Sequence, residues 1–274
     1  MVVKESYFNR HWENDPHEWI SASFTENQKV LREPAMHMLL GGENSPRSIV
    51  KFRGRRIYEN YLISRIYMEY CPHGDLDQVY TEHAKHSMIH GDTLDENDQP
   101  MQLIRIPPRA LWSFCEDLAE AASFMEHGHD PLDPTSPLRE DWQTVIHRDL
   151  KLYNIFLGLP RTPGKRGIPE LKVGDFGLAI PHDYEENPGK MVGFGTDAWK
   201  APEQTDNALK HKLSSATNVW AMGRIVLALV ELSAPRPAPV LYGEFHQGRV
   251  QHAPGKMNVK DSTAKSSTGL SRAV

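Results

Sequence analysis

The sequence predicts a mixed fold of α-helices and β-strands. Apolar residues in Leu111–Met125 recur at a spacing of about 3.6 residues, typical of an amphipathic helix, and that helix should end at Gly128. Two runs rich in β-branched and aromatic residues, Ile49–Phe52 and Leu62–Tyr70, predict strands. Residues 219–232 are apolar on almost every side, which predicts a helix buried in the middle of a domain.

Composition indicates a globular protein of the cell interior. The 274 residues are 39% hydrophobic and 24% charged, and 31 basic against 36 acidic side chains give a net charge of −5. This balance carries no electrostatic signal for nucleic acid or an anionic membrane. Only Cys71 and Cys115 are present, as in a reduced compartment, and the apolar run 219–230 is too short to span a bilayer. We therefore expect an intracellular protein, cytoplasmic or nuclear, that binds neither nucleic acid nor membrane; its oligomeric state is not indicated.

Capping residues, prolines and glycines mark the ends of other predicted elements. Thr25 and Gln28 form a capping box that predicts the start of a first helix, which should end at Gly41. Pro34 predicts either a kink or a late restart of this helix. The polar stretch Thr81–Gln102 is interpreted as a surface loop.

Short strands and a polar tail follow. Val145–Ile146, Ile155–Leu157 and Leu171–Val173 are predicted strands. Residues 234–274 contain few large apolar side chains and are predicted to be disordered.

Three short motifs stand in a fixed order between the predicted long helices. Residues 147–154 read HRDLKLYN, 175–177 read DFG and 201–203 read APE. Together they resemble the signature set of the eukaryotic protein kinase family, serine/threonine type. The resemblance covers about residues 2–232 and implies a bilobal protein-kinase-like α+β fold. In that fold a partial small β lobe (1–70) and a mostly helical large lobe (71–233) hold ATP between them.

The resemblance assigns chemistry to residues of these motifs. Phosphoryl transfer requires an aligned acceptor oxygen and cations that neutralise spreading charge. In the family, Asp149 would accept or orient the substrate hydroxyl and Lys151 would steady the transferred phosphate. Asn154 and Asp175 would each hold Mg²⁺ through a hard oxygen. Lys151 resembles the serine/threonine version of this loop, which implies a protein substrate with Ser or Thr acceptors.

Arg148 would pair with a phosphate on the activation segment in the family. Thr196 belongs to the loop that faces the substrate in the family, so the usual phosphorylation switch is not evident between the second and third motifs. We therefore hypothesise that Asp183, Glu185 or Glu186 partners Arg148 instead.

The resemblance also implies a nucleotide pocket. Residues 65–76 look like the fifth kinase strand and the hinge that follows it. Met68 would be the gatekeeper, the Glu69 carbonyl and Cys71 amide would bind adenine, and Asp75 would lie near the ribose.

Lys4 resembles the third-strand lysine that pairs with the α/β-phosphates and with a helix glutamate. Glu33 is the candidate partner. Pro34 directly after it keeps Glu26 open as the alternative.

Several departures from the family are visible. No glycine-rich phosphate loop precedes Lys4, and the last helices of the large lobe have no counterpart. Asn218 stands where the family has an acidic residue, although its amide oxygen can still accept hydrogen bonds. Glu203 would lack the arginine that it pairs with in the family and would then be an unpartnered carboxylate. These departures predict low stability and weak nucleotide affinity.

Two other functions stay open. A remnant of a kinase could act as a catalytically weak nucleotide-binding or scaffold protein. A zinc site is the other possibility, built on the histidines His83, His86, His90, His127 and His129, although no cysteine pair or glutamate-flanked motif accompanies them.

Overall fold

The computed structural model describes residues 1–8, 19–20, 30–90, 105–160, 167–182, 193–206 and 213–232. All of them belong to one compact unit, Met1–Pro239, and the second unit, Val240–Val274, lies outside the described residues. The predicted disordered tail (234–274) and the capping box at Thr25 therefore fall outside the described part. The described chain is a mixed α+β protein.

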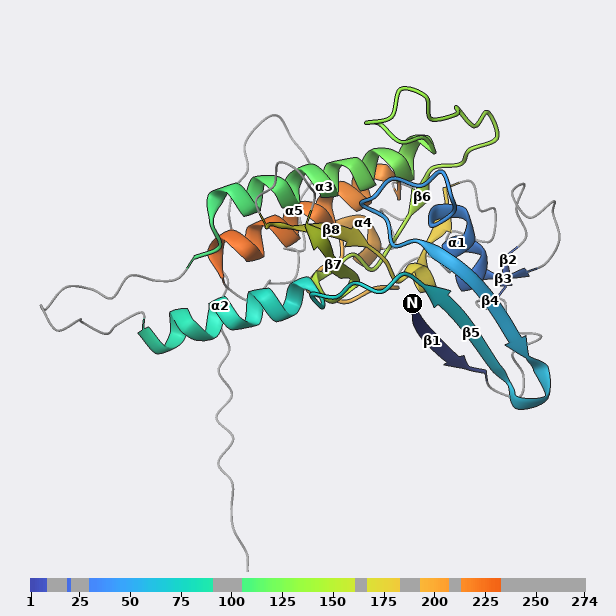
Figure 1. Cartoon of the computed structure of the whole chain (residues 1–274), viewed down its shortest axis with the longest axis horizontal. Coiled ribbons are helices and arrows are strands. Elements are labelled where there is room, and N and C mark those ends of the chain that lie inside the picture. The colour runs from blue at the N-terminus through green and yellow to red at the C-terminus, as the bar shows by residue number, and fades with distance from the viewer. Residues whose placement is uncertain are drawn as a thin grey trace, which may run out of the picture. The chain divides into compact units, whose positions relative to one another are not determined.

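A three-stranded antiparallel sheet has the order β1 (Val2–Tyr7), β5 (Ile63–Met68) and β4 (Phe52–Tyr58). Lys4 pairs with Ile66 in the register, and Ile66 is 1% exposed, so Lys4 lies on the buried face of the sheet. Figure 1 shows α1 (Arg32–Leu40) beside this sheet. The strand predicted at 62–70 is thus confirmed.

The run Ile49–Phe52 was only partly a strand. β4 begins at Phe52, whereas Ile49 forms an isolated bridge with Val173 and the Val50 amide donates to the Val173 carbonyl at 2.9 Å. These apolar residues therefore join a neighbouring strand instead of the sheet, and periodicity cannot distinguish the two partners.

Of the two expectations at Pro34, the late start of the helix is correct and the kink is wrong. α1 begins at Arg32, so Pro34 lies in its first turn, where backbone N–H groups have no partner within the helix and proline costs little. The helix ends at Gly41, as predicted. Two short paired strands, β2 (Trp19–Ile20) and β3 (Val30–Leu31), lie before it.

The predicted loop at Thr81–Gln102 is wrong over its first part, because α2 spans Leu76–His90. Its start is set by Asp75, whose Oδ1 accepts a hydrogen bond from the Gln78 amide at 3.0 Å, and by Leu76, which is fully buried. A good cap and one buried anchor outweigh the weak apolar periodicity of the helix.

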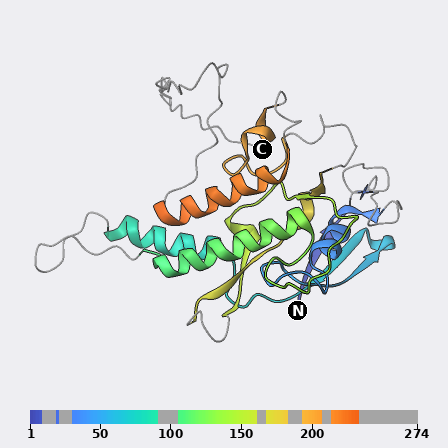
Figure 2. The same ribbon diagram turned by 90° about the horizontal axis from the view of Figure 1, so that it is seen from above.

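Two long helices confirm the apolar patterns. α3 (Pro108–His127) ends at Gly128 in left-handed geometry (φ 75°), and α5 (Ser215–Glu231) runs beside it (Figure 2). The expectation that α5 is buried all round is wrong for one face, since Val219 is 59% exposed and Val230 50%.

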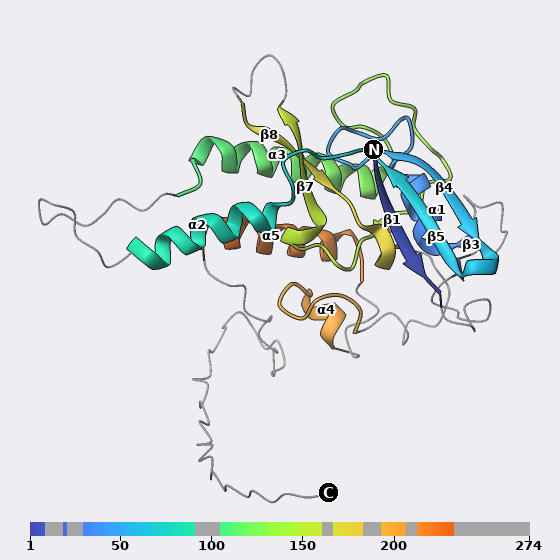
Figure 3. The ribbon, with the colours of Figure 1, turned by 60° about the horizontal axis from the view of Figure 1, so that its bottom comes forward.

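A β-hairpin lies between the three-stranded sheet and the long helices (Figure 3). β7 (Ile155–Pro160) and β8 (Pro169–Val173) pair antiparallel, and β8 packs against α3. Figure 3 shows the sheet and α1 on one side, the helices α2, α3 and α5 on the other, and the hairpin between them. The remaining short elements are β6 (Val145–Ile146), β9 (Ile180–Pro181), α4 (Pro202–Thr205) and the 3-10 turns η3 (Glu59–Tyr61), η4 (Leu152–Asn154) and η5 (Phe176–Leu178).

Among the described residues, no helix is both long and apolar enough to cross a lipid bilayer.

Replacing Gly41 by alanine should lower the free energy of unfolding by about 1–3 kcal/mol, because a Cβ there would lie 2.6 Å from the Val50 carbonyl oxygen and 2.7 Å from the Phe52 amide, which are backbone atoms that cannot turn away. Gly223→Ala is the matched control. Its Cβ meets nothing within 4 Å, and alanine in an exposed helix interior should raise stability by about 1 kcal/mol. Urea unfolding of both variants tests the pair, and equal shifts would contradict it.

Candidate active site

One cavity of about 330 Å³ lies where the buried face of the sheet meets the loops after β6 and β8. It is lined by Lys4, Ser6, Tyr7, Phe8, Arg32, Glu33, Asp149, Asp175, Gly177 and Leu178. Residues far apart in the chain therefore share one hollow. Four of the predicted site residues, Lys4, Glu33, Asp149 and Asp175, are among them.

The Lys4 ammonium joins two carboxylates from different elements. Its Nζ lies 2.6 Å from Glu33 Oε1 on α1 and 2.7 Å from Asp175 Oδ1 before η5. Burial lowers the pKa of Lys4, but the charges of Glu33 and Asp175 outweigh it and hold the pKa above its ordinary value. Burial likewise raises the pKa of Asp175, and Lys4 reverses the shift to a net lowering. Glu33 is thus the partner of Lys4, and Glu26 lies outside the described residues.

Asp175 is held in a strained backbone conformation. Its φ is 59°, a left-handed geometry that L-residues adopt at a cost. The next residue anchors the turn, because Phe176 is fully buried and its amide donates to His37 Nε2 at 3.4 Å. The His37 ring meets the Phe176 ring edge-on at 5.0 Å. Burial, with the nearby Lys4 charge, lowers the pKa of His37 to about 3, so this imidazole is neutral.

The loop after β6 presents a compact group of polar side chains. Lys151 Nζ lies 2.9 Å from Asp149 Oδ2, and Asn154 Nδ2 donates to the Asp149 carbonyl at 2.8 Å and to its Oδ2 at 3.3 Å. The Thr196 hydroxyl donates to Asp149 Oδ1 at 2.8 Å and accepts from Lys151 Nζ at 2.9 Å. Asp149 is therefore oriented through both its oxygens and its backbone carbonyl.

Arg148 occupies the other side of this loop. Its φ is 66°, its Nε donates to the Leu178 carbonyl at 2.6 Å, and its guanidinium lies 4.7 Å over the Phe194 ring. The hypothesised partners Asp183, Glu185 and Glu186 lie outside the described residues, so that hypothesis stays a prediction.

Asn218 anchors the loop from α5. Its Oδ1 accepts the His147 amide at 2.9 Å, and its Nδ2 donates to the Val145 carbonyl at 2.7 Å. The expectation of an unpartnered Glu203 is wrong, because the Thr217 hydroxyl donates to Glu203 Oε1 at 2.6 Å. The hydroxyl of Thr217 on α5 therefore provides the hydrogen-bond partner of this carboxylate.

The residues predicted to hold adenine and ribose do not line this cavity. Met68 ends β5, and the Glu69 carboxylate pairs with Lys172 at 3.0 Å. Burial and the neighbouring Glu69 raise the pKa of the Cys71 thiol to about 11, which makes it unreactive. The Asp75 side chain caps α2, a structural role that the sequence prediction did not include.

Sequence reasoning missed several lining residues of the cavity. Ser6 shares the buried face of β1 with Lys4, and its hydroxyl lies 3.5 Å from Glu33 Oε2. The period-two alternation of a strand would have placed it there. Arg32 directly precedes Glu33 in the sequence. The residue at which α1 begins determines the side of the helix on which these two residues lie, and the sequence did not predict that residue.

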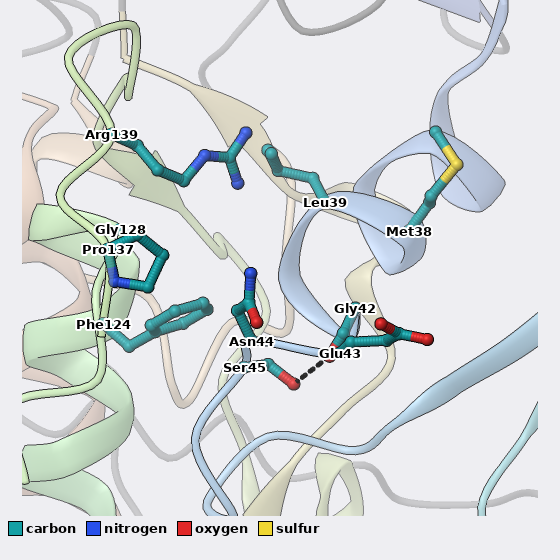
Figure 4. Close-up of a pocket in the computed structure, with 10 residues that line it drawn as sticks. All are labelled: Met38, Leu39, Gly42, Glu43, Asn44, Ser45, Phe124, Gly128, Pro137 and Arg139. Atoms are coloured by element: carbon teal, nitrogen blue, oxygen red, sulfur yellow. Dashed lines mark hydrogen bonds between the residues drawn. The ribbon is translucent and has the colours of Figure 1, made fainter. Parts of the chain in front are cut away.

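A second cavity of about 380 Å³ lies between the end of α1 and the end of α3. Figure 4 shows Arg139 and Asn44 reaching into it, above Phe124 and opposite Leu39. Its lining contains none of the predicted site residues.

The histidines do not assemble into a metal site within the described ranges, where no group of three potential ligands could hold an ion. His83, His86 and His90 belong to α2, whereas His127 and His129 stack on each other at 6.0 Å.

Comparison with known proteins accounts for this arrangement. A family profile described as "Protein kinase domain" matches residues 142–268. This match and the kinase relatives described below support membership of the eukaryotic protein kinase family. The kinase-family match includes the loop that carries Asp149 and the segment that carries Asp175, and it extends past the end of α5.

Known kinases align over between 42% and 85% of the chain. It is 27% identical over 235 residues to the human serine/threonine-protein kinase Nek2, covering 85% of this chain and 44% of that protein. It is 27% identical over 185 residues to the G2-specific protein kinase nimA of Emericella nidulans, covering 62% of this chain and 22% of that protein. It is also 32% identical over 123 residues to the lectin-domain containing receptor kinase VI.3 of Arabidopsis thaliana, with 42% and 16% covered. The chain spans less than half the length of these curated relatives.

Asn218→Asp should lower the free energy of unfolding by about 2 kcal/mol or more. The aspartate cannot donate to the Val145 carbonyl, and it places a charge where the side chain is 2% exposed. Urea unfolding measures the change. Asn60→Asp, on an exposed turn, is the matched control and should have little effect; equal stability of the two variants would refute the assignment.

Stability should fall below pH 6.5 in a way that depends on His37. The unfolded imidazole takes up a proton near its ordinary pKa of 6.5, whereas the native one stays neutral down to about 3. The unfolded state therefore gains about 1.4 kcal/mol per pH unit in this window. Between pH 7 and pH 5, wild type should lose about 2 kcal/mol more than His37→Leu, as measured by urea unfolding. Burial also lowers the pKa of His147, so part of the pH dependence should remain in His37→Leu. His73→Gln, on the surface, should behave as wild type; a pH dependence in His37→Leu equal to that of wild type would contradict the prediction.

Proposed function

We propose that this chain is a serine/threonine protein kinase that transfers the γ-phosphate of ATP, as its Mg²⁺ complex, to protein hydroxyls. One observation carries the proposal. Two groups face the same cavity. The first is Lys4, which pairs with two carboxylates. The second is Asp149, which is hydrogen-bonded to a lysine and to a hydroxyl. The first group suits a polyphosphate with its cation, and the second suits an acceptor hydroxyl.

The residues at the phosphate end fit a magnesium nucleotide. Asp175 supplies carboxylate oxygen, and Asn154, whose amide nitrogen is bonded to Asp149, offers its amide oxygen. Mg²⁺ prefers such oxygen ligands together with phosphate oxygens, and when bound it would neutralise charge on the transferred group. Lys4 would bind phosphate oxygens, and Glu33 would keep its ammonium aimed at the cavity.

The acceptor end suits an aliphatic hydroxyl. Thr196 already places one at hydrogen-bond distance from both Asp149 and Lys151. A substrate serine or threonine that binds next to Thr196 would meet the same two groups. Asp149 would then orient the hydroxyl and take its proton, and Lys151 would balance the charge of the phosphate.

The remaining predicted residues belong to the same proposal. The sheet and α1 would form a partial small lobe (1–70) and the rest a mostly helical large lobe (71–233). Adenine would bind the Glu69 carbonyl and the Cys71 amide next to Met68, and Asp75 would lie near the ribose. Arg148 would bind an anionic group of the activation segment. The partner is a protein with Ser or Thr acceptors; nucleic acid and membrane are not expected partners.

Asp149→Asn should reduce phosphate transfer from Mg-ATP to a generic basic protein by about 100-fold or more, because the amide can neither take the proton nor carry the charge. Transfer is measured with γ-labelled ATP, and phosphoamino-acid analysis should find phosphoserine or phosphothreonine. Asp141→Asn, on an exposed turn, is the matched control and should be fully active.

Nucleotide affinity, measured by calorimetry in parallel, separates the alternatives. Transfer that is absent from wild type despite binding of Mg-ATP would favour a nucleotide-binding scaffold and overturn the proposal. Phosphotyrosine as the main product would contradict the serine/threonine assignment.

A further inference from the structure

The buried ammonium group of Lys172 contacts Glu69, which belongs to the segment proposed to bind adenine. Lys172 on β8 is 8% exposed, and its Nζ lies 3.0 Å from Glu69 Oε1 and donates to the Arg47 carbonyl at 2.6 Å. Burying a charge is costly unless close partners compensate for it. These two short contacts therefore form a specific junction, unlike a mobile surface ion pair.

The junction connects the two ends of the proposed nucleotide site. Asp175 follows Lys172 by three residues along the same segment. Glu69 directly follows β5, and its amide donates to the Lys51 carbonyl at 3.0 Å. The ion pair therefore joins the segment that leads to the metal-binding carboxylate to the segment whose carbonyl would bind adenine.

Other charges near Lys172 lie at longer range. Glu170 Oε2 is 3.7 Å from Lys172 Nζ, and Arg47 lies 3.5 Å from Glu120 and 3.9 Å from Glu170. These longer pairs tie α3 and the loop after α1 to β8. The short Lys172–Glu69 contact is thus the ion pair that reaches the proposed hinge.

The Lys172 side chain packs closely against a glycine of the neighbouring strand. A Cβ placed on Gly158 of β7 would lie 2.8 Å from Lys172 Cε. Gly158 does not have a positive φ, so alanine is compatible with its backbone. Gly158→Ala would therefore push the lysine away from Glu69 without changing any charge.

We propose that Lys172 is a positioning residue that sets the hinge, residues 69–71, in register with Asp175, and so sets the affinity for the nucleotide. The assignment rests on the proposed function. Without Lys172 the Glu69 carboxylate, which is only 16% exposed, keeps no short cationic contact within the described part of the chain, and it moves toward water with its backbone. The groups that would act on the phosphate and the acceptor, Asp149 and Lys151, are untouched.

Lys172→Met keeps the length and apolar contacts of the side chain and removes its charge. The Kd for Mg-ADP and the KM for ATP should each rise about tenfold, the loss expected for one buried charged hydrogen bond, while kcat stays within about twofold. Gly158→Ala should shift both constants in the same direction. Lys172→Arg should restore part of the affinity, and Lys85→Met, an exposed lysine on α2, is the control and should change nothing. A fall in kcat at unchanged KM would overturn the assignment.

A double mutant tests the partner. Glu69→Gln should weaken nucleotide binding, and adding it to Lys172→Met should cost little more, because the two residues act through one contact. Fully additive losses would contradict the pairing.

Hydrogen exchange separates this inference from the proposed function. In the nucleotide-free chain, the amides of residues 69–73 should exchange faster in Lys172→Met and Gly158→Ala than in wild type, as read by mass spectrometry. If wild type transfers no phosphate or binds no nucleotide, the proposed function fails and the exchange result still decides the role of Lys172. Unchanged exchange in both variants would refute it. If Lys172→Met does not fold, Gly158→Ala provides the same readouts.

Discussion

The contact between one lysine and two carboxylates organises this molecule. Lys4 comes from the sheet, Glu33 from α1 and Asp175 from the turn after β8, and both carboxylates lie within 2.7 Å of the same ammonium. The ammonium offsets the repulsion between the two carboxylates, which would otherwise oppose their approach. This one charge therefore ties α1 and the turn of Asp175 to the sheet, together with the packing of buried side chains such as Phe176.

Neutral polar groups hold the loops around that charge. Asn218 satisfies a donor and an acceptor of the chain around β6, and neutral His37 accepts the Phe176 amide. Asn218 uses both ends of its amide in these bonds, and His37 uses its Nε2. Buried hydrogen bonds of this kind favour one backbone arrangement, because breaking them leaves further polar atoms unpaired. They offset the positive φ angles of Arg148 and Asp175, which the local sequence would not adopt unaided. Asp175 lines the cavity, and Arg148 directly precedes the lining residue Asp149.

Prediction from the sequence succeeded where a pattern is local and failed where partners are distant. The amphipathic repeat of α3 and its glycine stop are local features, and both were correct. α2 has a weak repeat and depends on the Asp75 cap, so it was mistaken for a loop. Pro34 left a kink and a late start of the helix open, and the structure has the late start, because α1 begins at Arg32. The partner of Glu203 was not predicted, because Thr217 lies on another helix.

The order and spacing of the HRDLKLYN, DFG and APE motifs determined the family and the chemistry expected of Asp149, Asn154 and Asp175, because those functions depend on residue type. Tertiary structure alone decided that Glu33 is the carboxylate beside Lys4, that Thr196 occupies the acceptor side of Asp149, and that Lys172 is buried against Glu69. The physical reason is that each of these contacts joins elements far apart in the chain, and packing sets their distance and register.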